Sequence, residues 1–147
     1  MTDQMPGQIS VATPTQVVER FLFALQDKDF DLVQDLLDDN ILYENVSVSR
    51  IRGRGKVVKL LRGLGGPHMG FEVKIHRSAV DGTSVLNERT DAVRFGRFRM
   101  QFWVCGVFEV REGRITLWRD YFDFYDMTKA ALRGLFAMVV PALRQSL

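Results

Sequence analysis

Four long segments in the second half of the chain alternate apolar and polar residues, as β-strands with one buried face do. They are rich in β-branched and aromatic residues, and tight-turn signals such as Asp81-Gly82 and Glu112-Gly113 separate them. Turns this short join antiparallel neighbours, so the chain is expected to contain an antiparallel sheet. The four predicted strands span residues 71–79, 84–94, 97–110 and 114–125.

Helical periodicity precedes and follows these strands. Thr13, Pro14 and Gln16 form the signature of a capped helix start, and apolar residues follow at helical spacing. A second short helix is predicted after Asp29, a third over about 55–64, and a last one over about 127–144. A short strand over 40–47 precedes the third helix. Helices followed by an antiparallel meander predict an α+β domain.

The length and composition indicate one globular domain. The chain has 147 residues, of which 46% are hydrophobic and 26% charged. We predict a single domain over 13–147 after a disordered tail over 1–12. Because the 20 Lys and Arg nearly balance the 18 Asp and Glu, no nucleic-acid partner is expected. The one tight basic cluster, residues 50–56, is interpreted as a solvated loop.

No metal site or membrane span is expected. The single cysteine, Cys105, cannot form an internal disulfide, and His68 and His76 are not spaced as metal ligands. The first twelve residues lack the pattern of a signal peptide, so the cytoplasm is the expected location. The apolar stretch over 130–143 is too short to cross a bilayer and indicates a packed or interface helix.

An aspartate occupies the apolar face of the last predicted strand. Period-two alternation puts Asp120 on the same side as Trp118 and Phe122. It also puts Phe124 on this side. A buried, unpaired carboxylate is costly, so Asp120 needs a cationic or donor partner. Arg89 is the best candidate, because it lies on an otherwise apolar strand face and its guanidinium can bind two acceptors.

Asp91 shares the face of Arg89 and can bind the other side of its guanidinium. Two carboxylates around one cation leave one excess negative charge in a dry site, and protonation of one carboxyl relieves it. An acid and a base then coexist at neutral pH, as general acid–base catalysis requires. A purely structural Asp–Arg–Asp cluster has the same composition, so these three residues alone favour a structural role.

Two neutral polar residues strengthen the catalytic interpretation. Tyr43 and Asn45 share the inward face of the short strand over 40–47, and their side chains can hold a water molecule beside a carboxylate. With them the residues form a candidate active site. The remaining inward positions are apolar, so Trp118, Phe122 and Val93 are expected to contact a bulky apolar substrate.

Other catalytic motifs are missing from the sequence. It contains no G-x-S-x-G nucleophile elbow, no phosphate-binding P-loop and no dinucleotide fingerprint. Cys105 is interpreted as an inert core thiol rather than a nucleophile, because no charged residue adjoins it. The alternation turns Asp123 to the opposite face, and Asp126 is expected to cap the last helix.

Three segments together resemble the limonene-1,2-epoxide hydrolases: Tyr43-Glu44-Asn45, Glu88-Arg89-Thr90-Asp91 and Trp118-Arg119-Asp120-Tyr121-Phe122-Asp123. The resemblance extends over about 15–126, and it is weakest after residue 126. It implies a cone-shaped α+β fold of the nuclear-transport-factor-2-like kind. In such a fold a strongly curved mixed sheet, N-terminal helices and a C-terminal helix surround a deep apolar pocket. It also implies a homodimer without a cofactor.

The resemblance further implies the roles of the polar residues. Asp120 would be the base that takes a proton from water, and Tyr43 and Asn45 would hold that water. Asp91 would be the acid that protonates the epoxide oxygen, and Arg89 would bind both aspartates. Two alternatives stay open, since one fold serves many functions. They are an isomerase or cyclase acting on a carbon acid, and a non-catalytic carrier of an apolar ligand.

Overall fold

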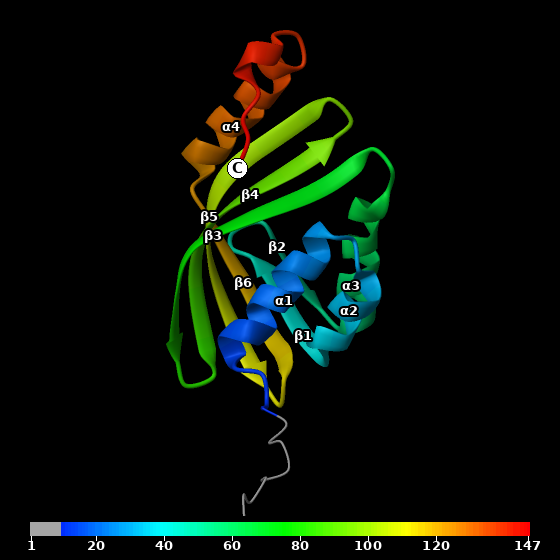
Figure 1. Ribbon diagram of the computed structural model, residues 1–147, viewed down its shortest axis with the longest axis vertical. Helices are drawn as coiled ribbons and strands as arrows, with labels where there is room; N and C mark the ends of the chain where they lie inside the picture. Colours follow the sequence, from blue (N-terminus) through cyan, green and yellow to red (C-terminus); the bar gives the residue numbers. More distant parts are fainter. Residues whose placement is uncertain (1–9) are drawn as a thin grey trace, which may run out of the picture.

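The computed structural model describes residues 10–147, in which helices pack against one strongly curved sheet (Figure 1). Residues 1–9, which hold most of the predicted tail, lie outside the described residues. In chain order the elements are α1 (Pro14–Gln26), α2 (Phe30–Leu36), β1 (Leu37–Asn45), β2 (Ser49–Arg52), α3 (Arg54–Arg62), a 3-10 turn (Gly63–Gly65), β3 (Met69–Asp81), β4 (Ser84–Phe95), β5 (Phe98–Arg111), β6 (Arg114–Phe122), α4 (Phe124–Ala137) and a second 3-10 turn (Pro141–Leu143).

The sheet has six strands in the order β2-β1-β6-β5-β4-β3. The strands from β3 to β6 form the predicted antiparallel meander, whereas β1 lies parallel to β6. The sheet bends around α1, and α2 and α3 lie on the same side (Figure 1). The mixed α+β fold expected from the resemblance is therefore confirmed.

The start of α1 follows the predicted capping chemistry. The Thr13 hydroxyl accepts a hydrogen bond from the Gln16 backbone N–H, and the Gln16 side chain accepts one from the Thr13 N–H. One face of α1, including Phe21 and Leu22, is fully buried against the concave side of the sheet. Asp29 caps α2 as expected, by accepting from the Leu32 N–H.

The prediction of a solvated loop for the basic cluster over 50–56 is wrong, because the cluster begins in a strand and its residues from Arg54 onward lie in α3. Residues Ser49–Arg52 form β2, which pairs antiparallel with β1. Arg50 forms an ion pair with Glu44 of that neighbouring strand at 2.6 Å. The strand is only four residues long and contains a single apolar residue, Ile51, so no hydrophobic periodicity marks it.

The predicted end of the last strand and the predicted helix cap are also wrong. The strand β6 ends at Phe122, because the Asp123 carboxylate accepts hydrogen bonds from the N–H groups of Tyr125 and Asp126 and caps α4. Phe124 therefore begins the helix and is exposed instead of facing inward. The predicted helix over 127–144 is a shorter α-helix followed by a separate 3-10 turn.

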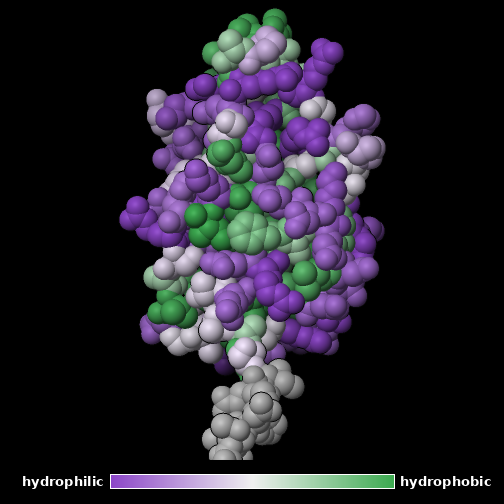
Figure 2. Space-filling view, viewed as in Figure 1, coloured by the Kyte–Doolittle hydropathy of each residue, from purple (hydrophilic) through white to green (hydrophobic). Residues whose placement is uncertain are grey.

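Helix α4 covers an edge of β5 that β6 leaves open. The pairing of these strands ends where Phe122 meets Val104, and α4 runs beside the remaining part of β5 (Figure 1). The Asp126 carboxylate accepts a hydrogen bond from the Trp103 N–H, which lies beyond the end of the pairing with β6. Figure 2 shows apolar side chains gathered at this end of the molecule. Within residues 10–147 none of the helices combines the length and apolarity needed to cross a membrane.

Gly134 permits the close approach of α4 to β5, which yields a test of this packing. A Cβ atom at Gly134 would clash with the Arg99 backbone carbonyl and with the Phe98 ring at 2.8 Å. We expect Gly134→Ala to lower the free energy of unfolding by about 1–3 kcal/mol despite the higher helix propensity of alanine. Denaturant unfolding measures this change.

Gly55→Ala is the matched control. Gly55 lies in α3, and nothing lies within 4 Å of the position its Cβ would take. This substitution should leave stability unchanged or raise it by up to about 1 kcal/mol. If both variants are equally stable, α4 does not lie on β5 at the distance described here.

Candidate active site

Arg89 is the centre of a buried polar cluster on the concave face of the sheet. Its Nε and Nη2 donate to the two carboxylate oxygens of Asp91 at 2.9 and 3.1 Å. Nη2 also donates to Oδ2 of Asp120 at 2.7 Å. Arg89 has no exposed surface, and both aspartates are at most 4% exposed. The structure thus brings together the three charged residues that the alternation predicted.

A glycine on β5, the strand between β4 and β6, lets the side chain of Arg89 on β4 reach Asp120 on β6. Gly106 of β5 pairs with Asn87 on one side and with Asp120 on the other. A Cβ atom at Gly106 would clash with Nη1 of Arg89 and would lie 3.0 Å from the Asn87 side-chain oxygen. The absence of a side chain therefore opens the space over β5 in which the guanidinium lies.

Asn87 binds the third side of the guanidinium. Its Oδ1 accepts from Nη1 of Arg89 at 3.1 Å, and the residue is 2% exposed. Because arginine only donates, this contact fixes which end of the amide faces it. Sequence reasoning placed Asn87 on the inward face but did not include it in the site. Asn87 could have been found from the sequence, because it lies two residues before Arg89 and shares its face. The role of Gly106 could not, because it depends on how β4, β5 and β6 are paired.

Tyr43 and Asn45 reach the cluster from β1, which lies parallel to β6. In this register Tyr43 pairs with Trp118 and Asn45 pairs with Asp120. The Tyr43 hydroxyl accepts from Nδ2 of Asn45 at 3.0 Å, and its ring stacks on Trp118 with the ring centroids 4.0 Å apart. All five predicted catalytic residues therefore lie on three strands around the same point of the sheet.

Three buried polar atoms of this region have no hydrogen-bond partner among the described residues. They are Oδ1 of Asp120, Nε1 of Trp118 and Nδ2 of Asn87. A buried polar atom left unpaired costs about 1–3 kcal/mol, so each such atom is expected to meet water or a ligand. The first is an acceptor and the other two are donors.

The environment holds the titratable groups in different protonation states. Burial raises the pKa of the Asp91 carboxyl from its ordinary value of 3.8 to about 6, although Arg89 opposes the shift. Burial alone would lower the pKa of Arg89, but the charges of Asp120 and Asp91 outweigh it and raise this pKa. Burial and the charge of Asp120 also raise the pKa of the Tyr43 phenol. Asp91 is therefore poised to carry a proton, while Arg89 stays charged and Tyr43 stays neutral.

The polar cluster lies between two apolar clusters. On β6, Asp120 separates Trp118, which packs with Phe21 and Phe108 under α1, from Phe122. Phe122 and Val93 pack in a second cluster with residues of β5 and α4. The three residues expected to contact substrate thus flank the aspartates from both sides.

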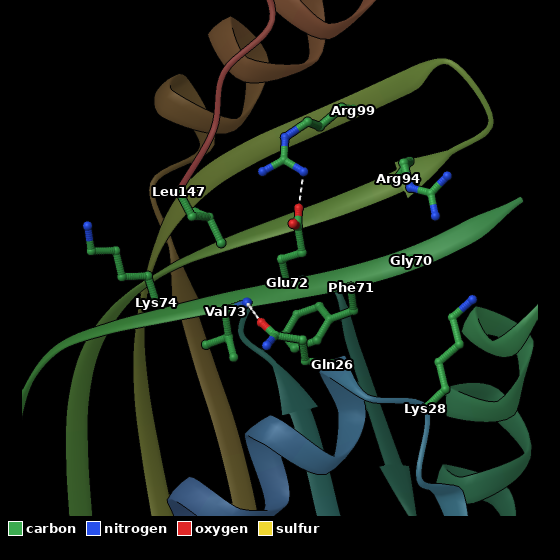
Figure 3. Close-up of a pocket in the computed structure, with 10 residues that line it drawn as sticks. All are labelled: Gln26, Lys28, Gly70, Phe71, Glu72, Val73, Lys74, Arg94, Arg99 and Leu147. Carbon is green, nitrogen blue, oxygen red and sulfur yellow. Dashed lines mark hydrogen bonds and ion pairs between the residues drawn. The ribbon is translucent and has the colours of Figure 1, made fainter.

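The other candidate sites lack comparable chemistry. A surface hollow of about 760 Å³ beside β3 contains Lys28, Lys74, Arg94 and the Arg99–Glu72 ion pair, but none of the predicted site residues (Figure 3). Residues 10–147 contain no group of three or more His, Cys, Asp or Glu side chains that could hold a metal ion. Cys105 is half-buried beside a hollow between β3, β4 and β5, so its assignment to the core was wrong.

Known proteins resemble this chain over most of its length. The family model of the limonene-1,2-epoxide hydrolase catalytic domain matches residues 12–133. The chain is 56% identical to a Mycobacterium tuberculosis protein named Epoxide hydrolase EphG, over 100% of this chain and 98% of that protein.

Solved structures give the same result. A structure of an M. tuberculosis LEH-like epoxide hydrolase is 60% identical, with a TM-score of 0.88 over 91% of this chain and 95% of that chain. An NTF2-like protein of unknown function from Cytophaga hutchinsonii is 18% identical, with a TM-score of 0.67 over 79% of this chain and 95% of that chain. The latter likeness concerns the fold alone. The chain belongs to the limonene-1,2-epoxide hydrolase family.

Proposed function

We propose that this protein adds water to an epoxide and releases a vicinal diol, with Asp120 as the base and Asp91 as the acid. The observation that carries the proposal is the buried Arg89 guanidinium bound to both carboxylates. Enclosure of two acids and one cation in a dry site favours one shared proton. General acid–base catalysis needs this combination of a protonated and an ionised carboxyl.

Asp120 is suited to the role of base by its unequal oxygens. Arg89 holds Oδ2, whereas Oδ1 has no partner among the described residues. Asn45 lies beside Asp120 in the strand register, and the Tyr43 hydroxyl is linked to Asn45. In our proposal these two neutral residues orient a water molecule whose proton passes to Oδ1 of Asp120.

The proposed reaction is a single concerted step. The water oxygen bonds to an epoxide carbon while the carbon–oxygen bond of the ring breaks. One proton passes from water to Asp120, and another passes from Asp91 to the epoxide oxygen. The two carboxyls thus exchange protonation states around Arg89, and the total charge of the site stays the same. Transfer of the proton back through solvent completes the cycle.

The substrate that we propose is bulky and apolar, of the terpene, sterol or lipid type. Trp118, Phe122 and Val93 supply apolar contact surface on both sides of the aspartates. The deep apolar pocket, the homodimer and the independence from a cofactor remain predictions that rest on the family resemblance. The cytoplasmic location remains a prediction that rests on the sequence of the N-terminus.

Incubation with terpene, aryl, fatty-acid and sterol epoxides tests the reaction. We expect diol formation from at least one class, and Asp120→Asn should slow it by about 10²–10⁴-fold because the base is lost. In a single turnover in heavy-oxygen water, the label should enter the diol directly. Label found in Asp120 would contradict the concerted step. Deuterium exchange into a ketone without diol formation would indicate an isomerase or cyclase instead.

The pKa of Asp91 predicts the pH dependence. The acid must carry its proton, so kcat/KM should fall about tenfold for each pH unit above about 6. The folded protein holds this proton more tightly than the unfolded chain does. The contribution of Asp91 to the free energy of unfolding therefore decreases as the pH rises from about 4 to about 7. The wild type should therefore lose stability relative to Asp91→Asn over this range. Denaturant unfolding measures this change. If the difference in the free energy of unfolding between the two proteins does not change with pH, Asp91 is not buried in the folded protein.

Replacement of Asn87 tests how Arg89 is held. Asn87→Leu removes the acceptor of Nη1, and the freed guanidinium should shift. We expect kcat to fall about 10–100-fold with KM little changed, because the aspartates lose their relative position.

Asn87→Asp is the matched control for this replacement. It retains an acceptor for Arg89 but adds a third carboxylate, which raises the pKa of its neighbours and should move the pH profile upward. A wild-type kcat in Asn87→Leu would show that the two aspartates hold Arg89 by themselves.

A further inference from the structure

Helix α4 is packed with its small side chains inward and its large apolar side chains outward. The buried stripe is Ala130, Gly134 and Ala137. The exposed side carries large apolar residues, among them Leu135 at 55% exposed and Phe136 at 62%. Lys129 and Arg133 share this side, but several large apolar side chains exposed together commonly mark a site of interaction. The outer side of α4 therefore has the composition of a contact surface.

Arginines gather beside this apolar surface. A hollow between β5, α4 and the chain after it is lined by Arg97, Arg99, Arg133 and Arg144. Arg99 forms an ion pair with Glu72, whereas no ion pair is found for the other three within the described range 10–147. Like charges that line one hollow repel one another, so the hollow favours an anion.

The charge of this region differs from that of the whole chain. Residues 92–99 and 127–147 contain six Lys and Arg but none of the 18 Asp and Glu, although the net charge of the chain is only +2. A second copy of the chain docked here by twofold symmetry would bring the same arginines face to face. The charges therefore favour an anionic partner over another copy of this protein.

The shape of the region favours a surface as that partner. Helix α4 and the turn after it form one end of the longest axis of the molecule (Figure 1). Apolar side chains gather at that end, above a band of hydrophilic ones (Figure 2). Apolar side chains that protrude among arginines are typical of proteins that insert into the headgroup region of anionic bilayers.

We propose that the outer side of α4 and the arginine hollow form a docking surface for an anionic phospholipid membrane. The large apolar residues of α4, such as Leu135 and Phe136, enter the interfacial layer, and the arginines bind lipid phosphates. The inner side of the same helix packs at Ala130 on the cluster that contains Phe122. If the proposed function holds, docking brings the substrate-contacting residues close to a phase that dissolves apolar epoxides.

Vesicle co-sedimentation of the full chain tests this proposal without any activity measurement. We expect at least tenfold tighter binding to vesicles of phosphatidylcholine with phosphatidylglycerol than to phosphatidylcholine alone. Binding should weaken strongly in about 0.5 M salt, because salt screens the arginines. The double variant Leu135→Ser/Phe136→Ser and the variant Arg144→Gln should each weaken binding at least tenfold.

Val80→Ser is the matched control, since Val80 is equally exposed but lies on the distant β3–β4 hairpin. It should bind vesicles as the wild type does. Equal affinity for both kinds of vesicle, or no binding, would overturn the proposal. So would a change from dimer to monomer in Leu135→Ser/Phe136→Ser, measured by light scattering, with vesicle binding unchanged. That result would assign the surface to a contact between copies.

Discussion

A guanidinium held out of water between two carboxylates is the interaction on which the arrangement of the sheet depends. The effective cost of burying each of these charges is several kcal/mol, and removal of one partner from such a pair costs about 3–5 kcal/mol. Arg89 and Asp91 lie on β4 and Asp120 lies on β6, so the contact must pass over β5. Gly106 makes this possible, and the position of the charges thereby restricts the strand between them.

The same constraint accounts for the chemistry of the site. Two carboxylates exceed the charge of one arginine, and burial raises the pKa of Asp91 to about 6, which brings protonation closer to neutral pH. Asn87 gives Nη1 of Arg89 a neutral acceptor, so it adds no further negative charge. One oxygen of Asp120 has no hydrogen-bond partner within residues 10–147, and this oxygen is where a base would act.

Alternation along the strands was sufficient to predict the inward charges, because side-chain parity depends only on local backbone geometry. Parity could not reveal Gly106, since its importance comes from the register between β4, β5 and β6. It also failed at Phe124, because the Asp123 cap ends β6 and changes the period. β2 escaped prediction for a related reason: it is stabilised by pairing with β1 and by ion pairs instead of by apolar burial.

The orientation of α4 follows from the edge of β5 that it covers. An uncovered strand edge invites pairing with other chains, and α4 prevents this by approaching the backbone so closely that Gly134 lies against the Arg99 carbonyl. Only small side chains fit on that side, so the large apolar residues of the helix must face outward. Protection of the edge and exposure of an apolar surface are thus two consequences of one packing arrangement. The apolar pattern over 130–143 predicted a packed or interface helix. The packing is found on the inner side of α4, and a contact on its outer side stays a prediction.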